Sequence, residues 1–178
     1  MSYEIFIIVP VAILIIGPVI YAINKRNRNA EERQYNEYFQ RNNIVVSSQY
    51  TYSTVLNSRQ IKFIVDEPNQ NIYISGRKGE LDRIAFSDVL GAEISADNQV
   101  VDGVGCALAG GIFAGSTTNA ICTYKVILYT KQISSPKKVL NIIDTKTQKD
   151  SFDYINAVNF AESVIATIKA VVSQQTIQ

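Results

Sequence analysis

The sequence predicts an α+β protein in which an N-terminal transmembrane helix precedes an antiparallel β-barrel or sheet and a C-terminal amphipathic helix. Three observations lead to this prediction. Residues 5–23 carry no charge, residues 44–143 contain short segments of strand character, and apolar residues recur with helical period over 154–174. We therefore expect a transmembrane helix at 5–23, a basic juxtamembrane and polar helical stalk at 24–43, and a folded domain at 44–178.

The composition excludes several classes of site. The 178 residues include 17 Lys and Arg, 16 Asp and Glu, two Cys and no His, which gives a formal net charge of +1. This charge argues against a strongly basic nucleic-acid binder. The absence of His rules out His-based acid–base catalysis and His-ligated metals, and two Cys are too few for a four-cysteine metal site. We expect no enzyme activity, no cofactor, no metal site and no nucleic-acid partner.

The charge-free run at 5–23 has the length of a membrane span. Nineteen residues of helix rise about 28 Å, close to the hydrocarbon thickness of a bilayer. Thirteen of them are Ile, Leu, Val or Phe, which contribute roughly −4 to −8 kcal/mol to insertion. A buried core helix is the first alternative, but the run has no polar face. A cleaved signal peptide is the second, but its cations would precede the run, whereas here Glu4 precedes it.

The cations after the run predict its orientation. Lys25, Arg26 and Arg28 follow the run directly, and positive flanks stay on the cytoplasmic side. We expect a single-pass protein of the cell membrane with its N-terminus outside and its C-terminal domain in the cytoplasm. The three cations would also attract anionic headgroups. In that reducing compartment, Cys106 and Cys122 are expected to be free, buried thiols.

The remaining chain predicts strands followed by one helix. Strand patterns occur at 61–66, 71–75, 83–86, 92–96, 123–130 and 138–143. The first two of them form a hairpin. Pro136 marks the turn between the last two, because proline cannot donate a hydrogen bond to a sheet. Ser151 or Asp153 can cap the helix at 154–174. Its apolar stripe is too wide to face water, so we expect it to cover an open side of the sheet or barrel.

A glycine-rich insert at 103–120 separates two groups of strands. Gly105 and Ala109, and Gly111 and Gly115, have the small-xxx-small spacing that lets helices approach closely. The apolar core of the insert is only about ten residues long, too short to span a bilayer. Three readings stay open: a loop or short helix packed on its own domain, a flap at the membrane or the anchor helix, and an oligomer contact.

Two groups of charged residues are candidate sites. Arg77, Lys78 and Arg83 form a basic cluster, which is either a solvated face or a contact for anions or lipid headgroups. Asp88 and Glu93 flank an expected strand bend and are the first carboxylates to test for catalysis. Turn capping and a solvent-facing strand position are the plainer roles for these two, so we expect a non-enzymatic protein.

The order of these elements resembles uncharacterised bacterial and phage proteins with a pleckstrin-homology-like (PH-like) domain. The matching stretches are 86–93 (Phe-Ser-Asp-Val-Leu-Gly-Ala-Glu), the Gly/Ala-rich 103–115, the strand 126–130, Pro136 and the helix start at 154–161. The resemblance covers about residues 61–172 and implies a PH-like fold, with no catalytic or binding residue to carry over. Ser116 to Asn119 interrupt the glycine run that many such proteins have.

These observations favour a membrane-anchored, cytoplasm-facing, non-enzymatic binding or adaptor module. Its expected partners are the lipid bilayer, a protein that the sequence does not identify, and a second copy through the glycine-rich segment. The alternative is a prophage-encoded superinfection-exclusion protein, because the chain is similar to these phage-immunity proteins in its size and its N-terminal anchor. That likeness concerns architecture alone.

Overall fold

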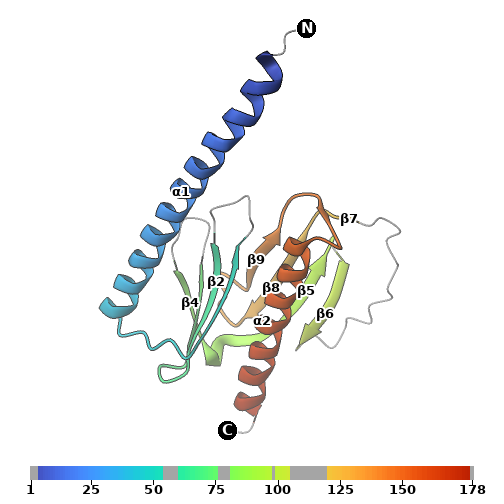
Figure 1. Cartoon of the computed structure of the whole chain (residues 1–178). Helices are drawn as coiled ribbons and strands as arrows, with labels where there is room; N and C mark the ends of the chain where they lie inside the picture. Colours follow the sequence, from blue (N-terminus) through green and yellow to red (C-terminus); the bar gives the residue numbers. More distant parts are fainter. Residues whose placement is uncertain (1–3, 54–59, 76–80, 98, 105–119, 177–178) are drawn as a thin grey trace. The chain divides into compact units, whose positions relative to one another are not determined.

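The computed structural model describes residues 4–53, 60–75, 81–97, 99–104 and 120–176, without the side chains of residues 4–18, 20, 24 and 99–104. The chain divides into two compact units, Met1–Ile44 and Val45–Gln178. The first unit holds helix α1, and the second holds all the strands and helix α2 (Figure 1). The structure is therefore α+β with antiparallel sheets and a C-terminal helix, as the sequence predicts.

Helix α1 is one continuous helix of 38 residues, Glu4–Arg41. At 1.5 Å per residue it is about 57 Å long. It contains both the charge-free run and the polar segment expected as a stalk. Near its end, Tyr35 and Phe39 are both buried, and their ring centroids lie 6.3 Å apart. This spacing of four residues brings aromatic side chains together on one face of a helix.

The end of α1 is fixed by a Schellman motif. Asn43 adopts a left-handed conformation with φ of 51°. Its N–H donates to the Gln40 carbonyl at 3.4 Å, and the Ile44 N–H donates to the Phe39 carbonyl at 2.9 Å. These bonds satisfy carbonyl groups that the helix leaves unpaired, and Asn is the residue that, after Gly, most readily takes this conformation.

The second unit contains two four-stranded antiparallel sheets, with strand orders β1-β2-β3-β4 and β6-β5-β8-β9, and a two-stranded pair, β10-β7. The chain crosses from the first sheet to the second through a short 3₁₀ helix, η1 (Phe86–Asp88). The strands are β1 Ser48–Ser53, β2 Gln60–Asp66, β3 Asn71–Ser75, β4 Leu81–Ala85, β5 Val89–Ala96, β6 Gln99–Val104, β7 Ala120–Ile121, β8 Tyr124–Thr130, β9 Lys137–Ile143 and β10 Thr147–Gln148.

Every predicted strand corresponds to an observed one. β3 has the predicted bounds, 71–75, and the ends of the other strands are shifted by one to three residues. The predicted hairpin is the β2–β3 pair, in which Asp66 faces Asn71. The strand expected at 83–86 begins at Leu81 and ends at Ala85, because Phe86 opens η1. Strands β1, β6, β7 and β10 were not predicted.

Helix α2 (Phe152–Thr176) closes the core between the two sheets. Its buried face packs with buried residues of both sheets, which confirms the role predicted from its apolar stripe (Figure 1). The buried residues of this face are Ala157, Phe160, Ala161, Val164, Ile165, Ile168 and Val171. Among the residues whose side chains the structure describes, α2 is the one helix long and apolar enough to cross a bilayer. Its apolar stripe is already covered by the strands of the second unit.

The N-cap of α2 gives a direct stability prediction. The Tyr154 N–H donates to Ser151 Oγ at 3.2 Å, so Ser151 is the capping residue of the two predicted. We expect Ser151→Ala to lower the free energy of unfolding by about 1 kcal/mol, because one backbone donor loses its partner. Urea unfolding of the full-length protein checks this. Ser173→Ala, near the other end of α2, is the control, and an equal loss in both variants would contradict the capping role.

The Tyr52 hydroxyl makes stability depend on alkaline pH. Burial, and then the negative charges of Asp153 and Asp144, raise the Tyr52 pKa from 10.0 to about 12. Since the unfolded chain ionises first, stability is fully present below about pH 10 and is lost as the pH rises towards about 12. The loss reaches about 3 kcal/mol. We expect the free energy of unfolding of Tyr52→Phe to fall less steeply with pH than that of the parent over this range. An equal pH dependence in the two proteins would contradict the assignment.

One expectation about the thiols was wrong. Cys122 is a free cysteine and is exposed, where the sequence predicted a buried thiol. It lies just after the two-residue strand β7, where the Asp97 carboxylate accepts the N–H groups of Cys122 and Thr123, each at 2.9 Å. The backbone is held there by hydrogen bonds, and the side chain needs no apolar cover. Cys106 lies outside the described residues.

Candidate functional site

A hollow of about 660 Å³ lies where the β2–β3 turn, η1 and the C-terminal end of α2 meet. We call it the Arg83 hollow. Its described lining residues are Asn69, Gln70, Asn71, Arg83, Ala85, Phe86, Ser87, Val171, Gln174 and Gln175. Amide side chains dominate this list, and Arg83 is its one charged member. The hollow is therefore polar, with a single positive charge.

Arg83 is oriented by its neighbour across the sheet. Its Nε donates to Asn71 Oδ1 at 2.9 Å, and Asn71 Nδ2 donates in turn to the Asn69 carbonyl at 2.7 Å. Asn71 is buried, whereas Arg83 is exposed. Among the described residues no carboxylate forms a salt bridge with Arg83. The bond through Nε holds the guanidinium group beside Asn71.

The turn that forms one wall is held by a buried carboxylate. Asp66 is fully buried, and its two oxygens accept the backbone N–H of Asn69 at 3.2 Å and the Asn69 side-chain amide at 2.8 Å. Gln70 has a φ of 54° and donates its N–H to the Glu67 carbonyl. An Asp at this position stabilises a tight turn through such side-chain bonds. The wall is therefore set before any ligand arrives.

The opposite wall is tied to η1 from a distant part of the chain. Gln175 Nε2 donates to the Phe86 carbonyl and, at 3.3 Å, to the Val89 carbonyl. The Phe86 N–H donates to the Gln70 carbonyl at 2.8 Å. These bonds connect the end of α2 to η1, and η1 to the β2–β3 turn. The three elements of the Arg83 hollow thus form one hydrogen-bonded frame.

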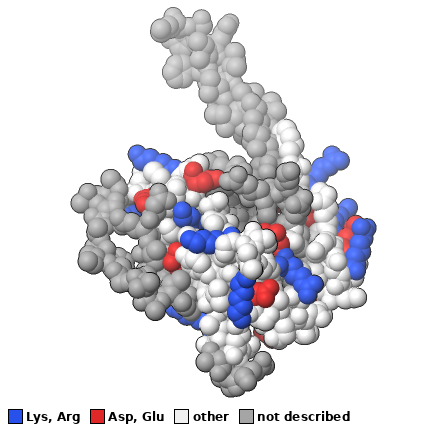
Figure 2. Space-filling view, turned by 180° about the vertical axis from the view of Figure 1, so that it is seen from behind, with Lys and Arg blue, Asp and Glu red and all other residues white. Residues whose placement is uncertain are grey.

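The chemistry of the hollow suits binding of an anionic group. A guanidinium offers paired donors that match a carboxylate or phosphate. The described lining contains no Asp, Glu, Lys or Cys. Figure 2 shows Lys and Arg interspersed with Asp and Glu over one face of the molecule. Where charges of both signs lie side by side, attraction for an anion depends on local geometry, because neighbouring charges of opposite sign cancel at longer range.

The other basic candidates are distributed differently. Lys25 and Arg26 are exposed on α1 and, with Arg33, line one groove along this helix, while Arg28 is half-buried. Arg77 and Lys78 lie outside the described residues, so the structure places only Arg83 of that cluster. The small residues Gly105, Ala109, Gly111 and Gly115 also lie outside the described residues.

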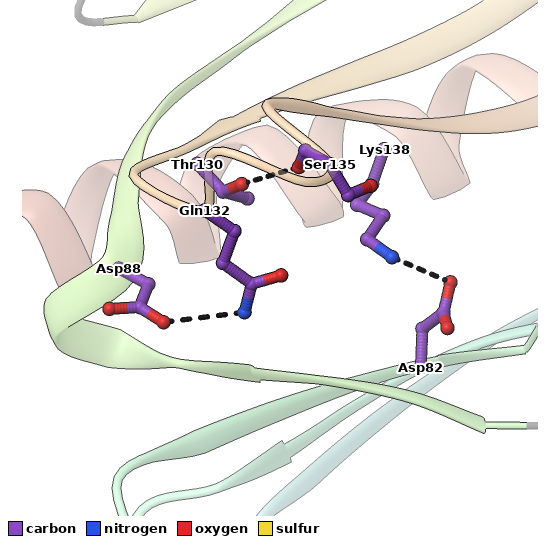
Figure 3. Close-up of polar contacts among 6 residues, drawn as sticks. All are labelled: Asp82, Asp88, Thr130, Gln132, Ser135 and Lys138. Carbon is purple, nitrogen blue, oxygen red and sulfur yellow. Dashed lines mark hydrogen bonds and ion pairs between the residues drawn. The ribbon is translucent and has the colours of Figure 1, made fainter.

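The two carboxylates singled out for catalysis both have structural partners. Asp88 Oδ2 accepts from Gln132 Nε2 at 3.3 Å, near the Lys138–Asp82 ion pair of the same length (Figure 3). Glu93 is buried, and its Oε1 accepts from the Tyr129 hydroxyl at 2.6 Å. Within the described ranges, no group of three or more His, Cys, Asp or Glu is placed to hold a metal ion.

Sequence reasoning found Arg83 but missed the amides around it. Asn69 and Gln70 lie between the two strands of the predicted hairpin, Asn71 begins the second of these strands, and the predicted helix ends at Gln174. A cluster of amides beside a predicted hairpin was the available signal. Nothing in the sequence indicated that the two groups meet.

Comparisons with known proteins add no relative. No family model matches the chain, and no curated protein or solved structure is significantly similar to it. The function is therefore argued from this chain's own residues.

Proposed function

We propose that this protein is a single-pass membrane protein in which α1 anchors a cytoplasmic, PH-like, non-enzymatic binding body. The observation that carries the proposal is the continuity of α1. One helix contains the 19-residue charge-free run and continues for 18 more residues to Arg41. About 28 Å of it matches the hydrocarbon layer, and about 27 Å extends beyond it.

The charges on α1 support the orientation. Lys25 and Arg26 are exposed directly after the run. Because such cations are retained on the cytoplasmic side, they support a cytoplasmic body and an external N-terminus. The exposed Cys122 thiol fits a reducing compartment, where no disulfide partner is needed.

The architecture of the body supports the PH-like assignment. Two antiparallel four-stranded sheets are followed by one C-terminal helix that packs between them. This element order is the one on which the resemblance was based. The body supplies concave surfaces between rigid elements, which is where binding sites form.

Alkaline carbonate extraction of membranes tests the anchor. We expect the full-length protein to stay in the membrane pellet after the wash and to be released by detergent. Release by carbonate alone would show a peripheral protein and would overturn the proposal.

Anion binding at Arg83 tests the binding role. We expect inorganic phosphate, or vesicles containing an anionic lipid, to raise the thermal unfolding temperature of the detergent-solubilised protein. Arg83→Gln should lower the affinity for the anion about tenfold, which is the cost of one charged hydrogen bond. About ten times more phosphate or anionic lipid would then be needed for the same rise in unfolding temperature. Lys131→Gln, which removes an exposed cation elsewhere, is the control.

The two probes distinguish the sources of the anion. A response to phosphate indicates a soluble anion, and a response only to anionic vesicles indicates a lipid headgroup. If neither probe acts, or if Arg83→Gln responds like the parent, the role of Arg83 in binding is wrong.

A further inference from the structure

A groove of about 600 Å³ lies along helix α1 at the end of the charge-free run. Its described lining residues are all exposed and all belong to α1: Ala22, Lys25, Arg26, Asn29, Ala30 and Arg33. Their spacing of three or four residues places them on one face of the helix. We call this surface the cationic face of α1. Its described lining contains three cations and no carboxylate.

The carboxylates of this part of α1 lie on other faces of the helix. At about 100° per residue, Glu31 lies about 170° from the middle of the cationic face and Glu32 about 90° from it. Among the described residues, no carboxylate forms a salt bridge with a cation of this face, whereas Arg41 pairs with Glu37 at 3.4 Å. The positive charges of the cationic face are therefore not neutralised by the described part of the chain.

The polarity of the cationic face changes along the helix axis. Ala22 belongs to the charge-free run, which ends at Ile23. Lys25 and Arg26 follow about 3 to 5 Å further along the axis. The headgroup layer of a bilayer extends about 5 to 8 Å beyond the hydrocarbon, so these two cations lie at its depth if the run spans the membrane. One end of the face therefore suits an acyl chain, and the next turn suits a headgroup.

Two arginines bound the polar part of this face. Arg33 follows Arg26 by seven residues, about 11 Å along the axis and on nearly the same line of the helix. The Cα–Cβ bonds of a helix tilt towards its N-terminus, so Arg33 tilts towards the run. The shorter side chains of Asn29 and Ala30 lie on the turn between the two arginines. This arrangement leaves room for a small anionic group between two guanidinium groups.

We propose that the cationic face of α1 binds the headgroup of an anionic phospholipid between Arg26 and Arg33. The proposal rests on the anchoring role of α1 proposed above and names the lipid class that this helix recognises. A guanidinium group binds a phosphate through paired, charged hydrogen bonds. Clusters of cations beside a membrane span attract anionic headgroups in the same way.

A soluble anion or an acidic peptide fits this face less well. Neither has an acyl chain that could contact Ala22 and the end of the charge-free run. Either would also have to enter the headgroup layer to reach Lys25 and Arg26. The position of the cations therefore favours an anion that is already part of the membrane.

The cationic face differs from the basic cluster that the sequence predicted. Arg28 belongs to that cluster, but it is half-buried and does not line the groove, and it lies about 130° from the middle of the face. Arg33 lines the groove and was not predicted. General attraction to an anionic surface weakens with distance, and Arg28 is closer to the run than Arg33. These two arginines therefore distinguish a specific site from general attraction.

Native mass spectrometry of the full-length protein in neutral detergent micelles tests the proposal. It compares phosphatidylglycerol, which is anionic, with phosphatidylcholine of the same acyl chains, which is neutral overall. Every protein in the experiment carries Arg83→Gln, so that the Arg83 hollow does not contribute. We expect the protein to retain phosphatidylglycerol at about tenfold lower lipid concentration than phosphatidylcholine.

Variants of α1 locate the lipid site. Arg26→Gln and Arg33→Gln should each weaken retention of phosphatidylglycerol about tenfold, to the level of phosphatidylcholine. Arg28→Gln is the matched control, because it removes the same charge from the same helix outside the groove, and it should leave retention unchanged. Thermal unfolding of each variant shows that it is folded.

Two soluble probes identify the class of occupant. Glycerophosphoglycerol is the same headgroup without acyl chains, and a short glutamate peptide carries negative charge without phosphate. Binding of either probe as tightly as phosphatidylglycerol would show that the face takes a soluble anion or an acidic peptide, and would overturn the proposal. Equal retention of the two lipids, or equal losses in Arg28→Gln and Arg33→Gln, would also overturn it.

The lipid assay is independent of carbonate extraction. A protein that selects phosphatidylglycerol in micelles but is released from membranes by carbonate would contradict the anchor and retain the lipid site. A protein that stays in the carbonate-washed pellet but retains both lipids equally would retain the anchor and contradict the lipid site.

Discussion

Replacing Leu14 and Ile15 together with arginine is expected to remove the protein from the membrane fraction. Both residues lie in the middle of the charge-free run. Each arginine costs about 2.5 to 3.5 kcal/mol at the centre of a span and also removes an apolar residue worth about 0.3 to 0.6 kcal/mol. The two changes together cost about 6 to 8 kcal/mol, which is comparable to the whole apolar contribution of the run, about 4 to 8 kcal/mol. Membrane fractionation followed by immunodetection measures the result.

A matched control adds the same charge to the same helix. Gln34→Arg with Gln40→Arg changes two exposed positions of α1 beyond the charge-free run. We expect this variant to remain in the membrane pellet. If the Leu14 and Ile15 double variant also stays in the carbonate-washed pellet, the run is not what holds the protein.

Phe63→Ala is expected to destabilise the body by about 3 to 5 kcal/mol. Phe63 is fully buried in β2, and its ring packs against Tyr50 with centroids 6.2 Å apart. Phe63 is the bulkiest of the fully buried side chains in the described residues, so truncation leaves a cavity in the core. This cost is a large fraction of the stability of a domain of this size. Urea unfolding of the full-length protein, followed by tyrosine fluorescence, measures the change.

Phe152→Ala is the control for that experiment. Phe152 begins α2 and is 69% exposed, so the same truncation removes little buried surface. We expect a change within about 0.5 kcal/mol. Similar losses for the two variants would show that the core is not centred on β2.

The strands that the sequence predicted are those whose pattern is strong. β2 and β8 are rich in β-branched and aromatic residues, and turn residues bound the β2–β3 hairpin. β1 was missed because four of its six residues are Ser, Thr or Gln, although Tyr50 and Tyr52 alternate in it. β7 and β10 have two residues each and owe their pairing to the surrounding fold. Periodicity cannot reveal so short a strand.

The candidate sites were less predictable than the fold. Arg83 stood out as a cation beside a strand, but its hollow depends on Gln175 reaching Phe86, 89 positions earlier in the chain. A groove lined by residues of β1 and α2 likewise requires two elements more than 100 residues apart to lie together. Tertiary packing creates both sites, and local sequence patterns do not encode such distant contacts. The roles of Arg77, Lys78 and the glycine-rich insert stay predictions.

Thiol labelling in intact cells tests the membrane topology most directly. The exposed Cys122 reports on the body once Cys106→Ser has removed the other thiol, and Ser2→Cys in a background without Cys106 and Cys122 reports on the N-terminus. With a maleimide that cannot cross the membrane, we expect Cys122 to react only after the cells are permeabilised, and the cysteine at position 2 to react in intact cells. Labelling of Cys122 in intact cells would place the body outside and contradict the account.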